Sequence, residues 1–152
     1  MDSVIIQGVT LAIAVLGALL GVMNTWRNWN LDRMRLRVTP AYGLDNTGGH
    51  NILVTVVNLS SFPVTVTTMG FTLVDSTRHM QVTAPIFMRG ERLPIRLEPR
   101  TSCTAVVALA ALEHAQLANI SCAYVTTACG QQIEGDSTAL RQMVHAAATA
   151  QQ

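Results

Sequence analysis

A long uncharged segment near the N-terminus constrains this chain more than any other feature. No charged residue occurs between Ser3 and Trp26, and most residues from 4 to 23 are apolar. About 20 mostly apolar residues in helical form cross the hydrocarbon core of a bilayer, and a helix satisfies its backbone hydrogen bonds internally, as lipid requires. The sequence therefore predicts one membrane-spanning helix near the N-terminus.

The flanks of this segment decide between a retained anchor and a cleaved signal peptide. A signal peptide begins with basic residues and ends at a cleavage site of small residues. Here Asp2 precedes the apolar run, and Asn-Thr-Trp-Arg follows it at 24–27. We therefore expect a helix that stays in the membrane.

Aromatic and basic residues mark the end of the predicted span. Trp26 and Trp29 follow the apolar run, and their amphipathic rings suit the headgroup zone. Arg27 and Arg33 lie close to them in sequence, so we expect all four residues at the membrane interface. More arginines follow, whereas no basic side chain precedes the span. Because positive residues favour the cytoplasmic side, we expect an outside N-terminus and a cytoplasmic C-terminal domain, or the equivalent inner side of a virus particle.

Small residues recur at helical spacing within the predicted span. Gly17 and Gly21 are four residues apart, and Gly8 and Ala12 repeat this spacing. Such pairs let two helix backbones approach closely, so these four residues are candidates for helix–helix packing. Glycine is also common in membrane helices generally, and the spacing alone leaves self-association open.

The chain after the membrane segment has the pattern of a β domain. Runs rich in β-branched residues are separated by turn signals about every ten residues, which predicts about seven to nine short strands in an antiparallel sandwich. The expected strands are 33–39, 51–58, 64–74, 79–83, 93–97, 103–109, 120–126 and a short one around Ile133. We expect Pro40 to end the first strand, residues 84–90 to form a loop, and Gly70 to mark a bulge or a close approach of another segment.

The C-terminal residues have the pattern of a helix. Ser137 suits a helix N-cap, and 138–150 contains good helix formers. We therefore divide the chain into a transmembrane helix with its interfacial border at 1–31, a β-sandwich at 32–136 and a C-terminal helix or tail at 137–152.

No residue pattern in the chain is typical of an enzyme or a cofactor site. The four histidines are scattered, and the phosphate-binding glycine motifs and the G-x-S-x-G motif are absent. Cys103 and Cys122 suit buried strands, and a Cys122–Cys129 bridge is the alternative if the domain faces an oxidising compartment. No zinc-like spacing of cysteine and histidine occurs. We expect no cofactor, no metal, no small-molecule substrate and no enzymatic activity.

Charge gives no sign of a nucleic-acid partner. The net charge is +1, charged residues make up 12% of the chain, and lysine is absent. Nucleic-acid binding needs clustered basic residues that neutralise phosphates. Arg89 and Arg92 flank Glu91 in a group that could bind an anion or a partner carboxylate, or could lie in solvent.

Four stretches of the chain carry a resemblance to known proteins. They are Trp-Arg-Asn-Trp at 26–29, Val-Thr-Val-Val-Asn-Leu-Ser-Ser-Phe-Pro-Val-Thr-Val-Thr-Thr-Met-Gly-Phe at 54–71, Leu-Pro followed by Leu-Glu-Pro within 93–99, and Ala-Tyr-Val-Thr at 123–126. Their order resembles small bacterial single-span membrane proteins of unknown function with a C-terminal Ig-like β-sandwich. That family usually has Gly where Leu59 or Ser60 stands here. The resemblance implies an Ig-like fold and carries no known activity or catalytic residues.

These expectations converge on a membrane-anchored, non-enzymatic structural or interaction module. Its expected partners are the lipid bilayer and other protein subunits, in a homo-oligomer or in a viral or envelope assembly. The alternative is a small membrane effector that oligomerises through its helix and perturbs the bilayer.

Overall fold

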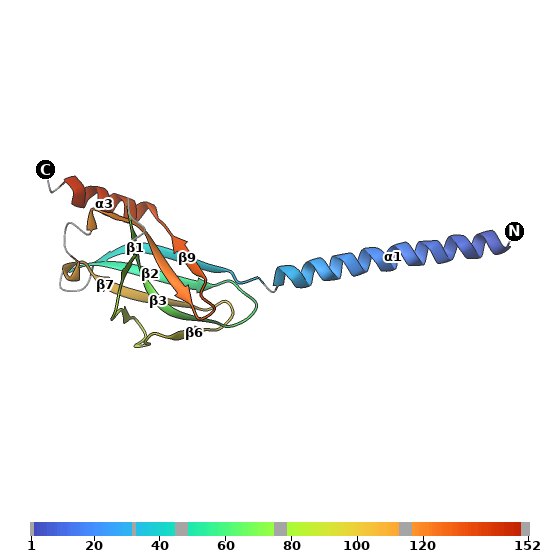
Figure 1. Cartoon of the computed structure of the whole chain (residues 1–152), viewed down its shortest axis with the longest axis horizontal. Coiled ribbons are helices and arrows are strands. Elements are labelled where there is room, and N and C mark those ends of the chain that lie inside the picture. Colours follow the sequence, from blue (N-terminus) through green and yellow to red (C-terminus); the bar gives the residue numbers. More distant parts are fainter. Residues whose placement is uncertain (1, 32, 45–48, 75–78, 113–116, 150–152) are drawn as a thin grey trace. The chain divides into compact units, whose positions relative to one another are not determined.

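The chain forms an N-terminal helix and a mainly β domain. The computed structural model describes residues 2–31, 33–44, 49–74, 79–112 and 117–149. They fall into two compact units that meet at the Arg33–Met34 bond. The first unit is the helix α1 (Asp2–Leu31), and the second holds nine strands in its described part (Figure 1). The predicted apolar helix, antiparallel β structure and short C-terminal helix are thus confirmed.

The strands of the domain form two antiparallel sheets. Sheet A has the order β1-β2-β7-β5, and its strands are β1 (Leu36–Leu44), β2 (His50–Asn58), β7 (Ser102–Ala108) and β5 (Ile86–Phe87). Sheet B has the order β4-β3-β8-β9, and its strands are β4 (His79–Gln81), β3 (Val64–Leu73), β8 (Ile120–Thr127) and β9 (Gln132–Gly135). A further strand, β6 (Ile95–Leu97), pairs with β3.

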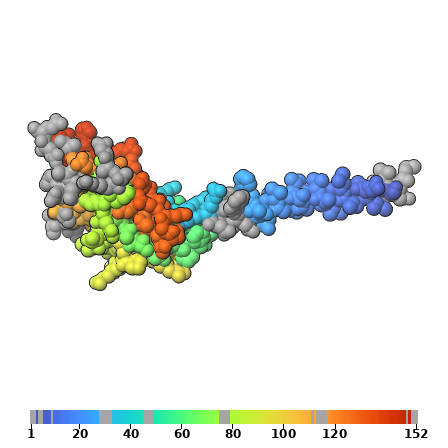
Figure 2. All heavy atoms as spheres, viewed as in Figure 1, coloured from blue at the N-terminus to red at the C-terminus, as the bar shows by residue number. Residues whose placement is uncertain are grey.

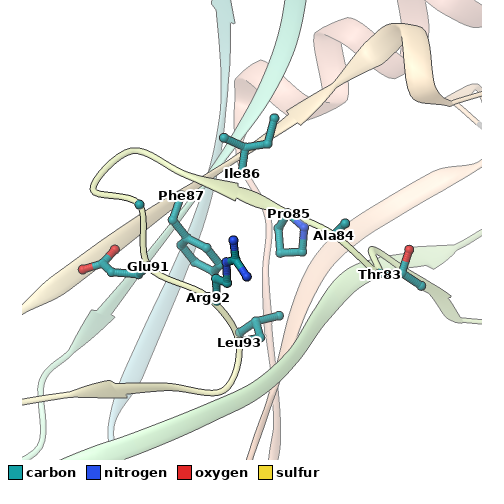
Figure 3. Close-up of a pocket in the computed structure, with 9 residues that line it drawn as sticks. Thr83, Ala84, Pro85, Ile86, Phe87, Glu91, Arg92 and Leu93 are labelled. Atoms are coloured by element: carbon teal, nitrogen blue, oxygen red, sulfur yellow. The ribbon is translucent and has the colours of Figure 1, made fainter.

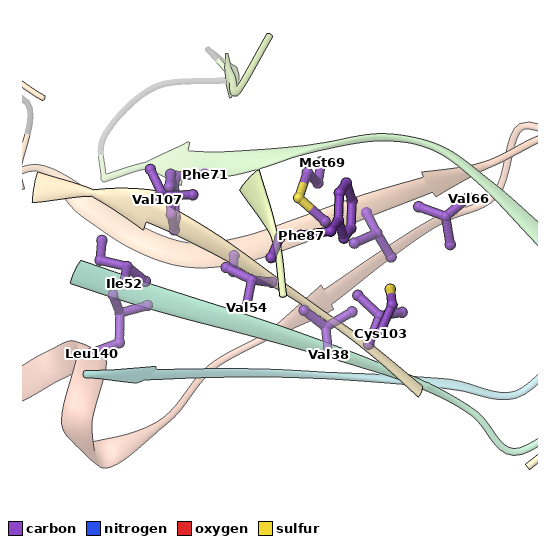
Figure 4. Packing of buried hydrophobic residues seen from close by; sticks show 14 of the residues in the cluster. Val38, Ile52, Val54, Val66, Met69, Phe71, Phe87, Cys103, Val107 and Leu140 are labelled. Carbon is purple, nitrogen blue, oxygen red and sulfur yellow. The ribbon is translucent and has the colours of Figure 1, made fainter. Parts of the chain in front are cut away.

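One hydrophobic cluster unites the two sheets. Alternate residues of the strands point inward, as the period-two pattern of a half-buried strand requires. Figure 4 labels members of this cluster from both sheets and from the C-terminal helix, namely Val38, Ile52, Val54, Val66, Met69, Phe71, Phe87, Cys103, Val107 and Leu140. The core is therefore aliphatic in the main, with Phe71 and Phe87 as its aromatic members.

Two helical segments of the domain lie entirely within the described residues. The turn η1 (Leu109–Ala111) follows β7, and the helix α3 (Thr138–Thr149) ends the described chain. Ser137 caps α3 as predicted, because its Oγ accepts a hydrogen bond from the Leu140 amide at 3.1 Å. Leu140 is buried in the common core, so α3 packs on its own domain. The last residue of the predicted helix, Ala150, lies outside the described residues.

Two sequence predictions about the strands are wrong. Pro40 lies in the middle of β1, opposite Val54, and does not end the strand. The strand β1 lies at the edge of sheet A. An edge strand tolerates proline because one of its sides pairs with no other strand and needs no backbone N–H donor. The predicted loop 84–90 contains the strand β5, whose two residues pair with β7.

Gly70 is a close approach, as predicted. A Cβ atom at this position would overlap the Met80 main-chain oxygen on the neighbouring strand β4 and come within 2.9 Å of the Tyr124 ring. The register of β3 against β8 also shifts between Val66 and Thr68, close to this point. The interruption of the β-branched run therefore marks a place where only glycine fits without movement of the backbone.

A buried asparagine that the sequence did not single out ties the sheets together. Asn58 at the end of β2 is fully buried. Its amide donates hydrogen bonds to the main-chain oxygens of Phe62 at 2.9 Å and Leu97 at 3.0 Å. Its side-chain oxygen accepts a hydrogen bond from the Ser60 amide at 2.9 Å. One side chain therefore satisfies the turn after β2 and joins sheet A to β6 of sheet B.

Candidate functional site: a membrane anchor and two sheet faces

The helix α1 is long and apolar enough to cross a membrane. The candidate span is Ile6–Arg27, 22 residues long, and its most apolar part is not buried by the described protein. At 1.5 Å per residue it is about 33 Å long, slightly more than the roughly 30 Å hydrocarbon core of a bilayer. Its side chains lie on the surface (Figure 2), and Leu11, Leu20 and Met23 are 65–68% exposed. Such a surface is stable in lipid and costly in water.

The hydroxyl groups of α1 are satisfied within the helix. Thr10 Oγ1 donates to the Ile6 carbonyl oxygen at 2.8 Å, and Thr25 Oγ1 donates to the Gly21 oxygen at 2.9 Å. Internal pairing of this kind lowers the cost of placing a hydroxyl in hydrocarbon. The polar threonines are therefore compatible with a membrane helix.

The predicted interface residues lie at the C-terminal end of α1 and, for Arg33, two residues beyond it. Trp26 is 71% exposed, and Arg27 and Arg33 are exposed as well. Trp29 belongs to α1, but its side chain lies outside the described residues. Their contact with headgroups and the orientation of the span stay predictions.

The predicted helix-packing residues have no neighbours within their own chain. A Cβ atom added at Gly8, Gly17 or Gly21 would meet nothing within 4 Å, and Ala12 is exposed. Successive residues of an α-helix are about 100° apart, so the Gly17–Gly21 pair and the Gly8–Ala12 pair lie on nearly opposite sides of α1. One helix neighbour cannot cover both pairs.

The outward positions of sheet A form a surface with almost no charge. Because the core residues alternate with them, the residues between them on β2 and β7 point outward. Cross-strand pairing aligns them in rows, an apolar row of Ala41, Leu53, Val106 and Ile86 and a threonine row of Thr39, Thr55 and Thr104. Among the outward residues of these four described strands, Arg37 alone is charged. We call the two rows the neutral face.

The outward positions of sheet B carry charged and hydrogen-bonding groups. Thr72 Oγ1 lies 3.5 Å from His79 Nδ1, and the His79 ring meets the Tyr124 ring edge-on with centroids 5.1 Å apart. Gln132 Nε2 donates to Glu134 Oε1 at 3.1 Å. We call this surface the polar face; it comprises Thr68, Thr72, His79, Tyr124, Thr126, Gln132 and Glu134. Much of its hydrogen-bonding capacity is used by its own residues.

An apolar groove of about 800 Å³ lies between α3 and the ends of β1 and β2. It is lined by Tyr42, His50, Leu109, Leu117, Ala139, Gln142, Met143, Ala146 and Ala147. The Tyr42 hydroxyl and His50 Nδ1 form a hydrogen bond to each other there. The groove thus offers apolar contact and one hydrogen-bonded pair.

A second cleft, of about 600 Å³, lies beside the loop that carries β5 (Figure 3). Glu91 and Arg92 extend from this loop in different directions. Arg89 and Arg92 are exposed, and within the described chain no ion pair joins either arginine to Glu91. Anion or carboxylate binding by the Arg–Glu–Arg group therefore stays a prediction.

All three cysteines are free thiols with different surroundings. Cys103 is buried in the core, and burial together with the Glu91 charge raises the pKa of its thiol to about 11. Cys129 is exposed, and hydrogen bonds with the Thr127 side chain and the Gln131 backbone lower the pKa of its thiol. Because the thiolate is the nucleophile, Cys129 is the reactive thiol and Cys103 an inert one.

The described residues contain no group of three or more His, Cys, Asp or Glu side chains that could hold a metal ion. No model of a known protein family matches the chain, and no match is found among curated proteins. The family resemblance at 26–29 and 54–71 therefore stays a prediction, and the functional assignment depends on the geometry of α1 and of the two faces.

Proposed function

We propose that the protein is a membrane-anchored, non-enzymatic interaction module that joins an assembly of its own copies. The observation that carries this proposal is the unburied apolar surface of α1. Burying one large apolar side chain is worth about 1.5–3 kcal/mol, so a helix that exposes such side chains all round is stable only inside a bilayer. The β domain is then held beside that bilayer.

We infer an Ig-like sandwich for the domain from its strand order. In an Ig-like fold one sheet has the order A-B-E-D and the other has C, F and G, with C′ added beside C in some members. The orders β1-β2-β7-β5 and β4-β3-β8-β9 correspond to A-B-E-D and C′-C-F-G. The strand β6 is an addition between the strands that correspond to D and E. Ig-like domains commonly serve in cell-surface recognition, which favours an interaction role.

The neutral face is the surface of the domain best suited to a neighbouring subunit. Cores of protein interfaces are depleted of charge, and the apolar row continues across all four strands of sheet A. Ile86 at its edge is 68% exposed. A second copy offers the same uncharged surface, and a two-fold contact of identical faces is the commonest form of association. Because the residues of the neutral face are uncharged, no repulsion between like charges opposes a contact of two such faces.

Membrane anchoring and orientation are tested together with a native thiol. Exposed Cys129 should react with a membrane-impermeant maleimide, whereas buried Cys103 should not. We expect full-length protein to resist carbonate extraction and to be labelled only after the cells are permeabilised, because the arginines after α1 favour a cytoplasmic domain. Cys129→Ser is the control and should lower the label to the slower reaction of the half-buried Cys122 thiol. Extraction without detergent would overturn the anchor, and labelling of intact cells would reverse the orientation.

The interaction role is tested by photocrosslinking in native membranes. A photoreactive residue at Thr104 on the neutral face should give one discrete dimer of this chain, and the same residue at Thr68 on the polar face should not. Both positions are half-buried strand threonines, so the two variants are matched. A chain that is crosslinked to nothing at Thr104 would contradict the proposed role.

The alternative function is a membrane effector that perturbs the bilayer through its oligomerised helix. The open glycine positions of α1 favour it, because no described part of the chain packs on them. Purified protein would then release dye from liposomes, and Gly17→Leu with Gly21→Leu would stop the release. Intact liposomes at every protein concentration would eliminate this alternative.

A further inference from the structure

The polar and small residues of α1 lie on one line with heptad spacing. If one starts at Ser3 and moves along α1 by four and three residues in turn, every position reached as far as residue 28 is polar or small. These positions are Ser3, Gln7, Thr10, Ala14, Gly17, Gly21, Asn24 and Asn28, which we call the small-polar stripe. Apart from Gly8, Ala12 and Ala18, every other residue between Val4 and Met23 is Val, Ile, Leu or Met. The rest of the span is thus a lipid-compatible surface.

The stripe occupies one side of the helix along its whole length. With 3.6 residues per turn, its positions fall within a sector about 100° wide. A strict heptad drifts by about 20° per repeat on a straight helix, and a left-handed supercoil of two helices removes this drift. The period therefore predicts a left-handed pair of helices, the usual geometry of membrane bundles.

Gln7 is the member of the stripe that most needs a partner. Its side chain is exposed, and no hydrogen bond to it is found within the described residues. A primary amide carries two donors and an acceptor, and an unpaired polar group in hydrocarbon is costly. A hydrogen bond across a helix–helix contact removes this cost.

A second copy of α1 supplies that partner at the correct depth. Copies inserted with one topology are parallel, so each residue of the stripe meets its own counterpart. The Gln7 amide can both donate to and accept from another Gln7 amide, and glycine at 17 and 21 lets the two backbones approach closely. A different protein would need polar groups at the same depths and the same spacing.

We propose that two copies of the protein associate through the small-polar stripe as a parallel, left-handed helix pair. This inference rests on the proposed function, because it requires α1 to span a bilayer. It also decides between the two candidate packing pairs. Gly17 and Gly21 belong to the contact, whereas Gly8 and Ala12 lie on the opposite side and face lipid.

Cysteine scanning of the full-length chain in native membranes tests the contact. With Cys122 and Cys129 replaced by Ser, single cysteines are placed along α1 and oxidised to disulfide-linked dimers. We expect maximal crosslinking at positions 10, 14, 17 and 21, and minimal crosslinking at positions 12, 16 and 19, which lie on the opposite side. Equal crosslinking at all positions, or maxima at 8 and 12, would overturn the proposal.

A matched pair of double variants tests the contribution of the small residues. Gly17→Leu with Gly21→Leu should weaken dimerisation, measured by energy transfer between labelled chains in liposomes, by about tenfold or more. Gly8→Leu with Ala12→Leu adds similar bulk to the other side and should change it by less than about twofold. Gln7→Leu should weaken it less than the first double variant. Equal effects of the two double variants, or association only with another protein, would refute the helix pair.

Carbonate extraction of each variant keeps this test separate from the proposed function. Leucine favours both the helix and the membrane, so all variants should stay anchored. Anchored chains that are monomeric would refute the helix pair alone, whereas wild-type chains that are extracted without detergent would refute the anchor itself.

Discussion

The outward faces of the two sheets of the β domain share threonine residues and differ in charge and in aliphatic surface. Both faces are rich in threonine. On the polar face, His79, Tyr124 and Glu134 contact their own neighbours, and charge is present. On the neutral face, Thr55 Oγ1 and Thr104 Oγ1 lie 3.1 Å apart beside a row of aliphatic side chains. A sheet face in water is usually polar, so this difference supports the proposal that the neutral face contacts another protein subunit.

The largest expected effect comes from breaking the link that both sheets share. Asn58→Ala removes the donor for main-chain oxygens on both sides of the core and leaves a cavity at a fully buried site. We expect the free energy of unfolding to fall by about 3–5 kcal/mol, measured by urea titration of the detergent-solubilised full chain. Gln81→Ala, which removes an exposed amide side chain of the edge strand β4, is the control and should change little.

An Asn58 variant with wild-type stability would mean that the sheets are held by apolar contact alone. The two sheets could then shift relative to one another without breaking a hydrogen bond. The present geometry, in which one amide is bonded to two segments, predicts the opposite.

Glycines on the two sheets give the next comparison. Gly70→Ala on sheet B drives a Cβ atom into the Met80 main-chain oxygen, which belongs to a paired strand and cannot rotate away. Gly43→Ala on sheet A meets only the Leu53 side chain, with the nearest carbon at 2.9 Å. We expect a loss of about 1–3 kcal/mol for Gly70→Ala and less than about 1 kcal/mol for Gly43→Ala, because a side chain can adopt another rotamer. Equal losses would show that backbone contact is not the deciding factor.

The sequence predicts the elements of the molecule better than it predicts these faces. Hydrophobic length defines α1, and β-branched runs locate β2, β3, β7 and β8. Pro40 misleads because its effect depends on whether β1 is an edge strand, which only the sheet order reveals. The strand β5 has two residues, which are too few to show an alternating hydrophobic pattern. It is a strand because it pairs with β7, and a single sequence does not reveal that pairing.

The candidate surfaces depend on register, which a single sequence does not specify. Leu53, Val106 and Ile86 are far apart in the chain and become one row only through pairing across three strands. The importance of Asn58 likewise depends on carbonyl groups from a different turn. In contrast, Trp26, Arg27, Gly17 and Gly21 are sequence-local features of α1, so they could be named from the sequence alone.

Charge placed on each face in turn tests the functional meaning of the difference between them. Thr55→Arg puts a cation at the centre of the neutral face, and in a two-fold contact the two cations would lie close together. We expect it to lower dimer formation by about tenfold, measured by crosslinking from Thr104, since an unpaired charge in an interface core is costly. Thr68→Arg on the polar face is the matched control and should have no effect. Unchanged dimer formation in Thr55→Arg would mean that the neutral face is exposed to solvent and is not the dimer contact.

The smallest effect is electrostatic and concerns the polar face only. Burial raises the pKa of the half-buried Cys122 thiol, the Glu134 carboxylate raises it further, and a hydrogen bond with Thr72 opposes them. A raised pKa means less thiolate at pH 8, so Glu134→Gln should restore thiolate and speed alkylation of Cys122 a few-fold in a Cys129→Ser background. Glu98→Gln, whose carboxylate pairs with Arg96 at 3.0 Å, should leave the rate unchanged. The gain in alkylation rate should shrink as the pH rises above the thiol pKa, because the thiolate then forms with or without Glu134. A gain that persists at that pH would assign the effect to packing. Charge would then not be the feature that distinguishes the two faces.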